Sequence, residues 1–341
     1  MKKAVLYLNL GTPLSPEEKD VKNYLKQFLM DPLVIDIPFV LRFLLVRGVI
    51  VPFRTKKSSH AYKSIWTDRG SPLRYICEDL VQKLNAKSQD ETFYALGMRY
   101  GSPSIEQALK LISKQNPDEL YVFSAYPQYA LSSTETGRLE VMKQANLILG
   151  SKTKVYFLES YAKDAGFISA CVEQIQRSAK EFQPDHYFFS YHGLPIRHVK
   201  KISPSCEGTG NCSLSDSEFN RRCYRRQSYQ TTEALVERLG LKTNQYSMGF
   251  QSRLSKNWIK PFSDEHYRSL PGRGVKKLLV VCPSFTADCL ETLEEVALRG
   301  REEFIANGGE DLRLVPCLND SDLWAQAIKG LLAKSDVWSR L

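Results

Sequence analysis

The chain has 341 residues, of which 43% are apolar and 25% charged, as is ordinary for a soluble globular protein, and this length allows two domains with separate hydrophobic cores. Its formal net charge of +9 favours an acidic small molecule or an anionic lipid surface as a partner. The basic residues are scattered and form no recognised nucleic-acid motif, and no uncharged stretch is long enough to span a bilayer, so the sequence argues against a nucleic-acid-binding or membrane-spanning protein.

The first residues run directly into a strand-like stretch at 4–10, with no secretory signal before it. In a chain without such a signal, the 8 cysteines favour reduced thiols or metal ligands over disulfide bonds. We therefore expect a cytoplasmic protein, with peripheral contact to the inner face of the cell membrane as a further expectation.

Short apolar runs typical of buried strands alternate with amphipathic, helix-like stretches, which predicts an α/β fold with parallel sheets. The runs divide into four and four near Gly150. This predicts two domains, 1–150 and 151–341, each with a four-stranded parallel sheet flanked by helices, and a last helix that packs back onto the first domain. Only Gly11 follows the first strand, so the dinucleotide fingerprint and the phosphate-binding loop are both missing. The predicted strands are residues 4–9, 93–97, 120–124, 155–159, 186–191, 245–250, 277–282 and 313–317.

Residues 31–54 depart from this pattern. They form a very apolar segment that Arg42, Arg47 and Arg54 interrupt and that two lysines follow. Two interpretations remain open: a buried pair of helices, or an apolar lip with basic flanks that suits a flat hydrophobic ligand and the bilayer interface.

The predicted strand 186–191 runs straight into His192, and Gly193 and Pro195 stop it from continuing. Open α/β sheets bind their ligands beyond the carboxyl ends of such strands. A histidine held there points into a crevice and titrates near neutral pH, so His192 is a candidate base or metal ligand as well as a candidate core histidine.

A second candidate element follows the seventh predicted strand. Thr286 is predicted to cap the next helix. At 100° per residue, Asp288, Glu291 and Glu295 fall on one narrow stripe opposite an apolar face. The helix dipole accounts for an acid in the first turn but less well for the two later ones. If His192 faces them, these carboxylates could receive a divalent ion in an open, transient site, deprotonate a bound ligand, or do both.

Seven short motifs follow one another along the chain, at residues 8–13, 70–72, 98–100, 126–129, 190–195, 250–253 and 285–293. Each is weak alone, but their order and spacing make a specific match. Together they resemble the ferrochelatases, which insert ferrous iron into a porphyrin late in haem synthesis, and the resemblance covers nearly the whole chain.

The resemblance implies two Rossmann-like α/β domains with a porphyrin cleft between them. It implies that His192 is the essential histidine and Glu291 the essential acid. Asp288 and Glu295 are implied to form an acidic track, so that the four residues make up the metal-binding set. The apolar lip at 31–54 is implied to touch membranes. The residues implied to bind porphyrin are Arg99, Tyr100, Tyr126, Trp258 and Phe285.

Metal insertion requires the porphyrin ring to buckle, the ion to shed its water and two inner N–H protons to leave. Rigid pocket walls can impose the buckling, with strain of about 1–5 kcal/mol drawn from binding the apolar periphery. A neutral imidazole is a competent base near pH 7, which makes His192 the candidate acceptor of the pyrrole protons. The three acids would bring iron in or conduct protons out, and whether His192 is chiefly base or metal ligand stays open.

Cys206, Cys212 and Cys223 lie in a polar insertion that is similar to the segment that holds a 2Fe–2S cluster in some bacterial ferrochelatases. The resemblance places the fourth ligand where this chain has Ser228, so the usual four thiolates are incomplete. Ser228 as an oxygen ligand, a remote cysteine, and loss of the cluster are the open alternatives. The cysteines predicted to be core residues are Cys77, Cys171, Cys282 and Cys317.

The leading prediction is a lyase that converts ferrous iron and protoporphyrin IX into protohaem and two protons. Two alternatives stay open: a chelatase for coproporphyrin III or another divalent metal, and a tetrapyrrole-binding carrier without catalysis. Retention of both His192 and Glu291 argues against the carrier.

Overall fold

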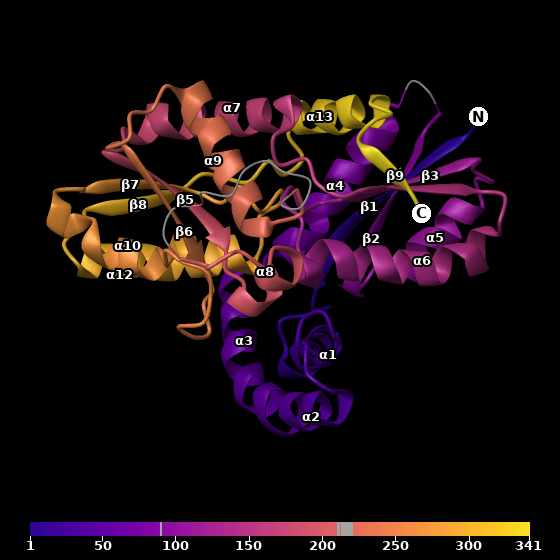
Figure 1. The fold of residues 1–341 in the computed structure, drawn as a ribbon, viewed down its shortest axis with the longest axis horizontal. Helices are drawn as coiled ribbons and strands as arrows, with labels where there is room; N and C mark the ends of the chain where they lie inside the picture. The colour runs from indigo at the N-terminus through magenta and orange to yellow at the C-terminus, as the bar shows by residue number, and fades with distance from the viewer. Residues whose placement is uncertain (89–90, 210–211, 213–220) are drawn as a thin grey trace. The chain divides into compact units, whose positions relative to one another are not determined.

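The structure is a computed structural model that describes residues 1–88, 91–209, 212 and 221–341. The chain forms two compact units, each with its own sheet (Figure 1). Unit 1 comprises Met1–Tyr126, Leu131–Glu159 and Ile328–Leu341, and unit 2 comprises Pro127–Ala130 and Ser160–Ala327. No helix among the described residues combines the length and the apolar character needed to cross a membrane.

Unit 1 contains a five-stranded sheet in the order β2-β1-β3-β4-β9. The first four strands in the chain pair in parallel, as predicted, whereas β9 pairs antiparallel with β4. This fifth strand corrects the expectation of four. Its three residues carry no apolar run from which a strand could have been read. The strands are β1 (Lys3–Thr12), β2 (Phe93–Gly101), β3 (Glu119–Ser124), β4 (Lys154–Leu158) and β9 (Trp338–Arg340).

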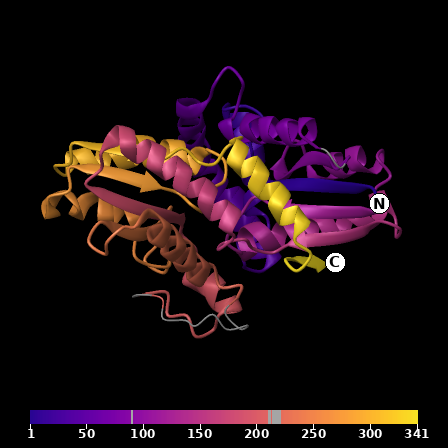
Figure 2. The ribbon, with the colours of Figure 1, turned by 90° about the horizontal axis from the view of Figure 1, so that it is seen from above.

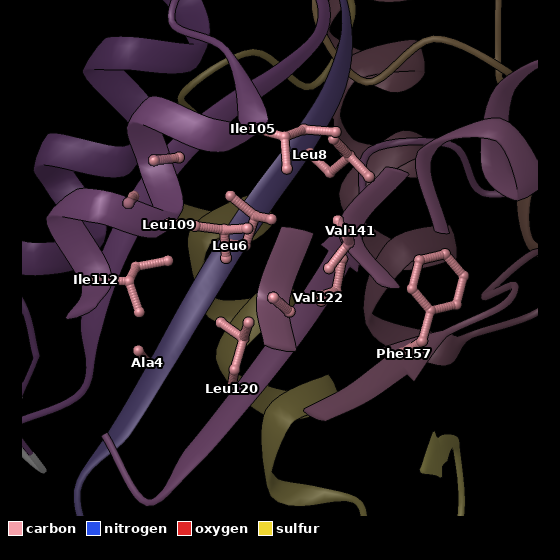
Figure 3. Close-up of a cluster of buried hydrophobic side chains, with 13 residues drawn as sticks. Ala4, Leu6, Leu8, Ile105, Leu109, Ile112, Leu120, Val122, Val141 and Phe157 are labelled. Atoms are coloured by element: carbon pink, nitrogen blue, oxygen red, sulfur yellow. The ribbon is translucent and has the colours of Figure 1, made fainter. Parts of the chain in front are cut away.

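One face of β1 forms the centre of the core of unit 1 through Ala4, Leu6 and Leu8, which alternate along the strand (Figure 3). They lie in one cluster with apolar side chains of α5 (Ile105–Ser113) and α6 (Thr136–Leu149). The intervening residues of β1 are buried as well. Burial on both faces explains why the strand reads as a continuous apolar run.

Most of the apolar segment at 31–54 lies in a run of helices, which Figure 1 draws in indigo. Phe39, Leu41, Leu44 and Phe53 are 63%, 58%, 60% and 81% exposed. The interpretation as a buried helix pair is therefore wrong, and the segment presents an apolar surface. The remaining helices of unit 1 are α1 (Glu18–Leu29), α2 (Phe39–Leu44), the π-helix η1 (Leu45–Ile50), α3 (Val51–Ile65), α4 (Pro72–Ala86) and the π-helix η2 (Leu131–Glu135).

Unit 2 contains a four-stranded sheet in the order β6-β5-β7-β8, and every pairing in it is parallel, as predicted. The strands are β5 (His186–His192), β6 (Tyr246–Gln251), β7 (Lys277–Val281) and β8 (Asp311–Leu314). The helices of unit 2 are α7 (Ala165–Phe182), α8 (Ile196–Ile202), α9 (Tyr224–Leu239), α10 (Ser263–Ser269), the 3₁₀-helix η4 (Pro271–Arg273), α11 (Leu290–Thr292), the π-helix η5 (Leu293–Gly300), α12 (Arg301–Ala306) and part of α13 (Asp322–Ala333). Figure 1 shows α7 and α9 on one side of the sheet and α10 and α12 on the other, and Figure 2 gives the view from above.

Candidate active site

His192 is the last residue of β5 and pairs with Gln251, the last residue of β6. The predicted position of this histidine at the carboxyl end of a strand is confirmed. Its backbone is held on two sides: the amide donates to Ser284 Oγ at 3.2 Å, and the Tyr224 hydroxyl donates to its carbonyl oxygen at 2.8 Å. The histidine therefore stands on a fixed backbone at the sheet edge where α/β folds bind ligands.

The orientation of the imidazole follows from one hydrogen bond. His192 Nδ1 lies 2.6 Å from the carbonyl oxygen of Gly193. Because a carbonyl oxygen can only accept, Nδ1 carries the hydrogen, and the neutral ring has its free lone pair on Nε2. The rings of Trp258 and Phe285 lie beside the imidazole, with centroid distances of 6.4 and 6.3 Å. Unit 2 thus brings both predicted aromatic residues next to His192.

The turn after His192 requires glycine. A Cβ atom at position 193 would lie 2.6 Å from the carbonyl oxygen of Gln251 and 3.1 Å from the ring of Trp258. The Gly193 amide also donates to that same Gln251 carbonyl at 2.8 Å. Any larger residue would push β5 and β6 apart at the point where His192 is held.

The acidic helix differs from its prediction. It begins at Leu290 with Cys289 as the N-cap, so the expected cap at Thr286 is wrong. The backbone of Thr286 is held in a loop instead, because its carbonyl accepts from the Asn319 amide at 2.8 Å. After α11 the chain continues as the π-helix η5, whose turns are wider than those of an α-helix. The 100° projection that placed three acids on one stripe does not apply to this element.

Asp288 lies in the loop before the helix, where its carboxylate accepts three hydrogen bonds. The donors are Asn319 Nδ2 at 2.7 Å, the Cys317 amide at 3.2 Å and Thr292 Oγ1 at 3.3 Å. The residue is 8% exposed. These bonds join the loop before α11 to the chain that follows β8, so Asp288 braces the acidic element.

Both carboxylate oxygens of Glu295 are bound by Ser252, whose amide donates at 2.7 Å and whose hydroxyl donates at 2.6 Å. Burial raises the pKa of Glu295, and Glu291 raises it further, whereas the bonds from Ser252 and the charges of His192 and Arg299 lower it. These mutual effects show that Glu295, Glu291 and His192 share one electrostatic environment.

Glu291 has a thiol beside it. Burial raises the pKa of Cys289 well above its usual value, and the negative charge of Glu291 and a hydrogen bond to it raise this pKa further. The thiol therefore stays protonated and donates to Glu291.

In the part of the chain that the structure describes, no three His, Cys, Asp or Glu side chains form a group that could hold a metal ion.

Two of the predicted porphyrin-binding residues of unit 1, Arg99 and Tyr100, are bound to Asp31, which sequence reasoning missed. Arg99 Nη2 donates to Asp31 Oδ2 at 2.6 Å, and the hydroxyls of Tyr100 and Thr136 donate to the same oxygen at 3.0 and 2.5 Å. Burial raises the pKa values of Tyr100 and Tyr126. Arg99 and Tyr100, near the end of β2, are thus tied to Asp31, the first residue of the 31–54 segment.

The cysteine insertion does not offer four thiolates. The Cys206 and Cys223 thiols are hydrogen-bonded to each other, which lowers the pKa of Cys206. Ser228 is fully buried and its hydroxyl donates to the Tyr224 carbonyl of its own helix at 2.9 Å. A serine used in this way is a poor cluster ligand, so the residues present do not fit a 2Fe–2S cluster of the usual kind. The cysteines predicted to lie in the core are all buried, at Cys77, Cys171, Cys282 and Cys317.

Sequence reasoning assigned no role to four residues that hold the site together. Gln251 and Ser252 come directly after a predicted strand, at the sheet edge where His192 also lies. That position is a signal that could have identified them. Tyr224 and Ser284 reach His192 from a helix start and a loop, and no sequence pattern marks them.

Solved chelatase structures resemble the chain in fold. SirB from Bacillus subtilis with Fe3+ matches with a TM-score of 0.57 and 10% identity, over 98% of both chains. The sirohydrochlorin chelatase SirB from Bacillus subtilis subspecies spizizenii in complex with cobalt matches with a TM-score of 0.53 and 10% identity, over 97% of this chain and 93% of that chain. At this identity the likeness concerns the fold alone, and it confirms the predicted Rossmann-like α/β class.

Sequence similarity is much closer. The ferrochelatase of Coxiella burnetii strain Dugway 5J108-111 is 41% identical over 335 residues, which are 97% of this chain and 93% of that protein. The ferrochelatase of Pseudomonas syringae pv. syringae strain B728a is 41% identical over 336 residues, with 97% and 98% covered. The family model described as ferrochelatase matches residues 2–336. The chain therefore belongs to the ferrochelatase family, the lyases that insert ferrous iron into a porphyrin in haem biosynthesis.

Proposed function

We propose that this chain inserts ferrous iron into protoporphyrin IX, giving protohaem and two protons, and that His192 accepts the pyrrole protons. The observation that carries this assignment is the 2.6 Å contact between His192 Nδ1 and the Gly193 carbonyl. It leaves Nε2 as the single basic position of the ring. A neutral imidazole with a fixed, open lone pair is suited to general-base catalysis near pH 7.

Two protons must leave the ring, so His192 has to pass on the first before it can take the second. Glu295 and Glu291 share its electrostatic environment. The raised pKa of Glu295 brings this carboxyl closer to the pKa of an imidazole, which eases proton transfer between the two groups. We assign to Glu295 the removal of protons from the site, and to Ser252 the support of its charged form.

Ferrous iron is a substrate that must pass through the site and leave with the product. Carboxylate and imidazole groups suit such an ion, and a site without a closed ligand shell allows it to be released. We assign Glu291 as the carboxylate that meets the iron next to His192. Asp288 supports this role from a distance, because its three hydrogen bonds hold the loop that leads to Glu291 in place.

The porphyrin is expected to bind against aromatic and rigid surfaces. Trp258 and Phe285 lie beside His192 and offer rings to the flat macrocycle. In unit 1, Arg99, Tyr100 and Tyr126 are the proposed porphyrin contacts, and Asp31 holds the first two in place. A rigid wall resists adapting to a planar ring and so favours the buckled form that exposes the nitrogen lone pairs.

The test is an anaerobic assay of ferrous iron with protoporphyrin IX and coproporphyrin III. Wild-type protein is expected to consume protoporphyrin, and His192→Ala is expected to lose at least about 100-fold in kcat, the usual contribution of general-base catalysis. The variant should still quench porphyrin fluorescence on binding. His60→Ala, at an exposed histidine, is the matched control. Near-normal turnover by His192→Ala would refute the assignment.

Peripheral contact with the inner face of the cell membrane is a further part of this proposal. The apolar lip, defined as the exposed apolar side chains of Phe39–Leu44 and of Leu45, Val49 and Phe53, supports it. No acidic residue occurs between positions 37 and 67, whereas Arg47, Arg54, Lys56 and Lys57 are exposed beside the lip. Such a combination suits an anionic bilayer surface that also delivers an apolar porphyrin.

We infer that the cysteine insertion holds no four-thiolate cluster, since Ser228 is committed to its own helix. Protein purified without porphyrin and without added iron is expected to lack the visible absorption of a 2Fe–2S centre. The Cys206→Ser and Cys223→Ser variants should give the same spectrum as the wild type. Visible absorption that disappears in these variants would overturn the inference.

A further inference from the structure

Gln251 connects three parts of the catalytic unit through one buried side chain. It is 4% exposed. Its Oε1 accepts from Ser190 Oγ of β5 at 2.6 Å, and its Nε2 donates to the backbone carbonyl of Glu291 at 2.7 Å. Ser190 is anchored in turn, because its hydroxyl lies 2.9 Å from Ser263 Oγ. The amide group is therefore used at both ends, as donor and as acceptor.

The backbone of Gln251 holds the turn that orients His192. Its carbonyl accepts from the Gly193 amide at 2.8 Å, and the Gly193 carbonyl fixes His192 Nδ1. Gln251 and His192 are also register partners at the ends of β6 and β5. Gln251 thus bonds both to the Gly193 turn, which orients His192, and to the backbone of Glu291.

The next residue extends this arrangement to the second acid. Ser252 has φ +62°, a left-handed conformation that side chains other than glycine seldom adopt. This conformation lets its amide and its hydroxyl reach the two oxygens of Glu295 at 2.7 and 2.6 Å. Backbone strain of this kind is maintained where the surrounding structure requires it, often at functional sites.

We propose that Gln251 is a positioning residue for the chelation reaction, which sets the distance between His192 and Glu291, and that Ser252 does the same for Glu295. The proposal rests on the proposed function of these three residues. A primary amide of this length meets both requirements at every pH, because it accepts from Ser190 while it donates to Glu291. A carboxylate at position 251 would accept but could not donate, whereas a protonated carboxyl could do both.

The chemistry of position 251 gives the test a signature that a purely structural role would not produce. Gln251→Met keeps the size but loses both bonds, and we expect kcat to fall about 10- to 100-fold at every pH, the typical cost of a small misplacement. Gln251→Glu is expected to recover activity only at low pH, where the new carboxyl is protonated. The KM and the dissociation constant for protoporphyrin should change little in either variant, because Gln251 does not face the porphyrin in this proposal.

Gln227→Met is the matched control. Gln227 is also 4% exposed and also bridges two backbone groups of unit 2, accepting from the Tyr129 amide at 2.6 Å and donating to the Arg221 carbonyl at 2.5 Å. The Gln227→Met variant should lower the unfolding midpoint in urea as Gln251→Met does, yet keep the wild-type kcat. Equal losses of kcat in the two variants, or none in Gln251→Met, would overturn the proposal.

Ser252→Gly tests the second half with little risk to folding, because glycine favours the left-handed conformation. It keeps the amide bond to Glu295 and removes the hydroxyl bond. We expect kcat to fall about 10-fold while the KM for protoporphyrin changes little, because one bond instead of two then holds the carboxylate in place. A wild-type kcat would overturn the role of Ser252. If the wild-type protein itself fails to turn over iron and porphyrin, the proposed function fails instead, and the two results are distinguishable.

Discussion

Single side chains in this site are held in place by hydrogen bonds with close neighbours. The Gly193 carbonyl fixes the hydrogen of His192 on Nδ1. Ser252 presents two donors to Glu295 and so favours its charged form, although burial and Glu291 outweigh this effect and the pKa of Glu295 is raised. The result is a carboxyl group that is held in place and that binds a proton more tightly than it does in water.

The raised pKa of Glu295 predicts a pH dependence of stability. A group whose pKa is raised on folding stabilises the protein fully below its unfolded pKa of about 4.3, and this contribution is lost as the pH rises through the folded pKa. Glu295→Gln removes this titration. The variant should therefore gain unfolding free energy relative to the wild type as the pH rises from about 4 towards 7. Urea unfolding at a series of pH values measures the difference.

Glu106→Gln provides a control of opposite sign for that measurement. Lys110 lowers the pKa of Glu106 through a hydrogen bond and through its charge. The contribution of Glu106 to stability is therefore present above about pH 4.3 and lost as the pH falls, and it is small because the side chain is exposed. A Glu295→Gln variant whose stability follows the wild type at every pH would contradict the predicted shift.

Among the helices and strands, those that follow simple periodicity could be predicted and those that depart from it could not. The strand that leads to His192 and the first strand of the chain were clear from apolar runs, because both faces of each are buried. The π-helix η5 was not foreseen, since an amphipathic pattern does not distinguish it from an α-helix. For the same reason the sequence indicated the acids at 291 and 295 but misplaced the helix start and the position of Asp288.

The proposed membrane contact of the apolar lip can be tested at Phe53. Phe53→Ser in α3 removes the most exposed ring of the lip, at 81% exposure. If the lip inserts into a bilayer, affinity for vesicles of anionic phospholipid should fall about 10-fold or more, because burying one such side chain is worth about 1.5–3 kcal/mol. Sedimentation with vesicles measures the affinity. Leu147→Ser on α6 removes a side chain of 84% exposure outside the lip and should bind like the wild type. Equal binding by Phe53→Ser would argue against insertion.

For the chain as a whole, the sheet of unit 1 draws on residues from widely separated parts of the sequence. Its last strand, β9, pairs with β4, which lies far earlier in the sequence. Trp338 attaches this strand: its ring meets that of Tyr121 edge-on with centroids 5.0 Å apart, and its Nε1 donates to the Leu331 carbonyl at 3.0 Å. Contacts of this kind join residues that are distant in the sequence, so no periodic pattern predicts the strand.

Trp338→Ala is therefore expected to lower the free energy of unfolding by about 2 kcal/mol, because a large ring that packs on unit 1 is removed from a half-buried position. Urea unfolding followed by circular dichroism measures the loss. Trp338→Phe keeps a ring against Tyr121 and should lose less. Wild-type stability in Trp338→Ala would show that β9 contributes little to unit 1.

The bond between His192 Nδ1 and the Gly193 carbonyl also bears on how product leaves. With one ring nitrogen occupied, the other can carry either a proton or an iron, never the two at once. A histidine that has just taken a pyrrole proton is barred from becoming an axial ligand of the newly formed haem. While the proton stays on Nε2, this imidazole cannot hold the iron, so the step that removes the pyrrole proton also leaves the haem free of a histidine ligand.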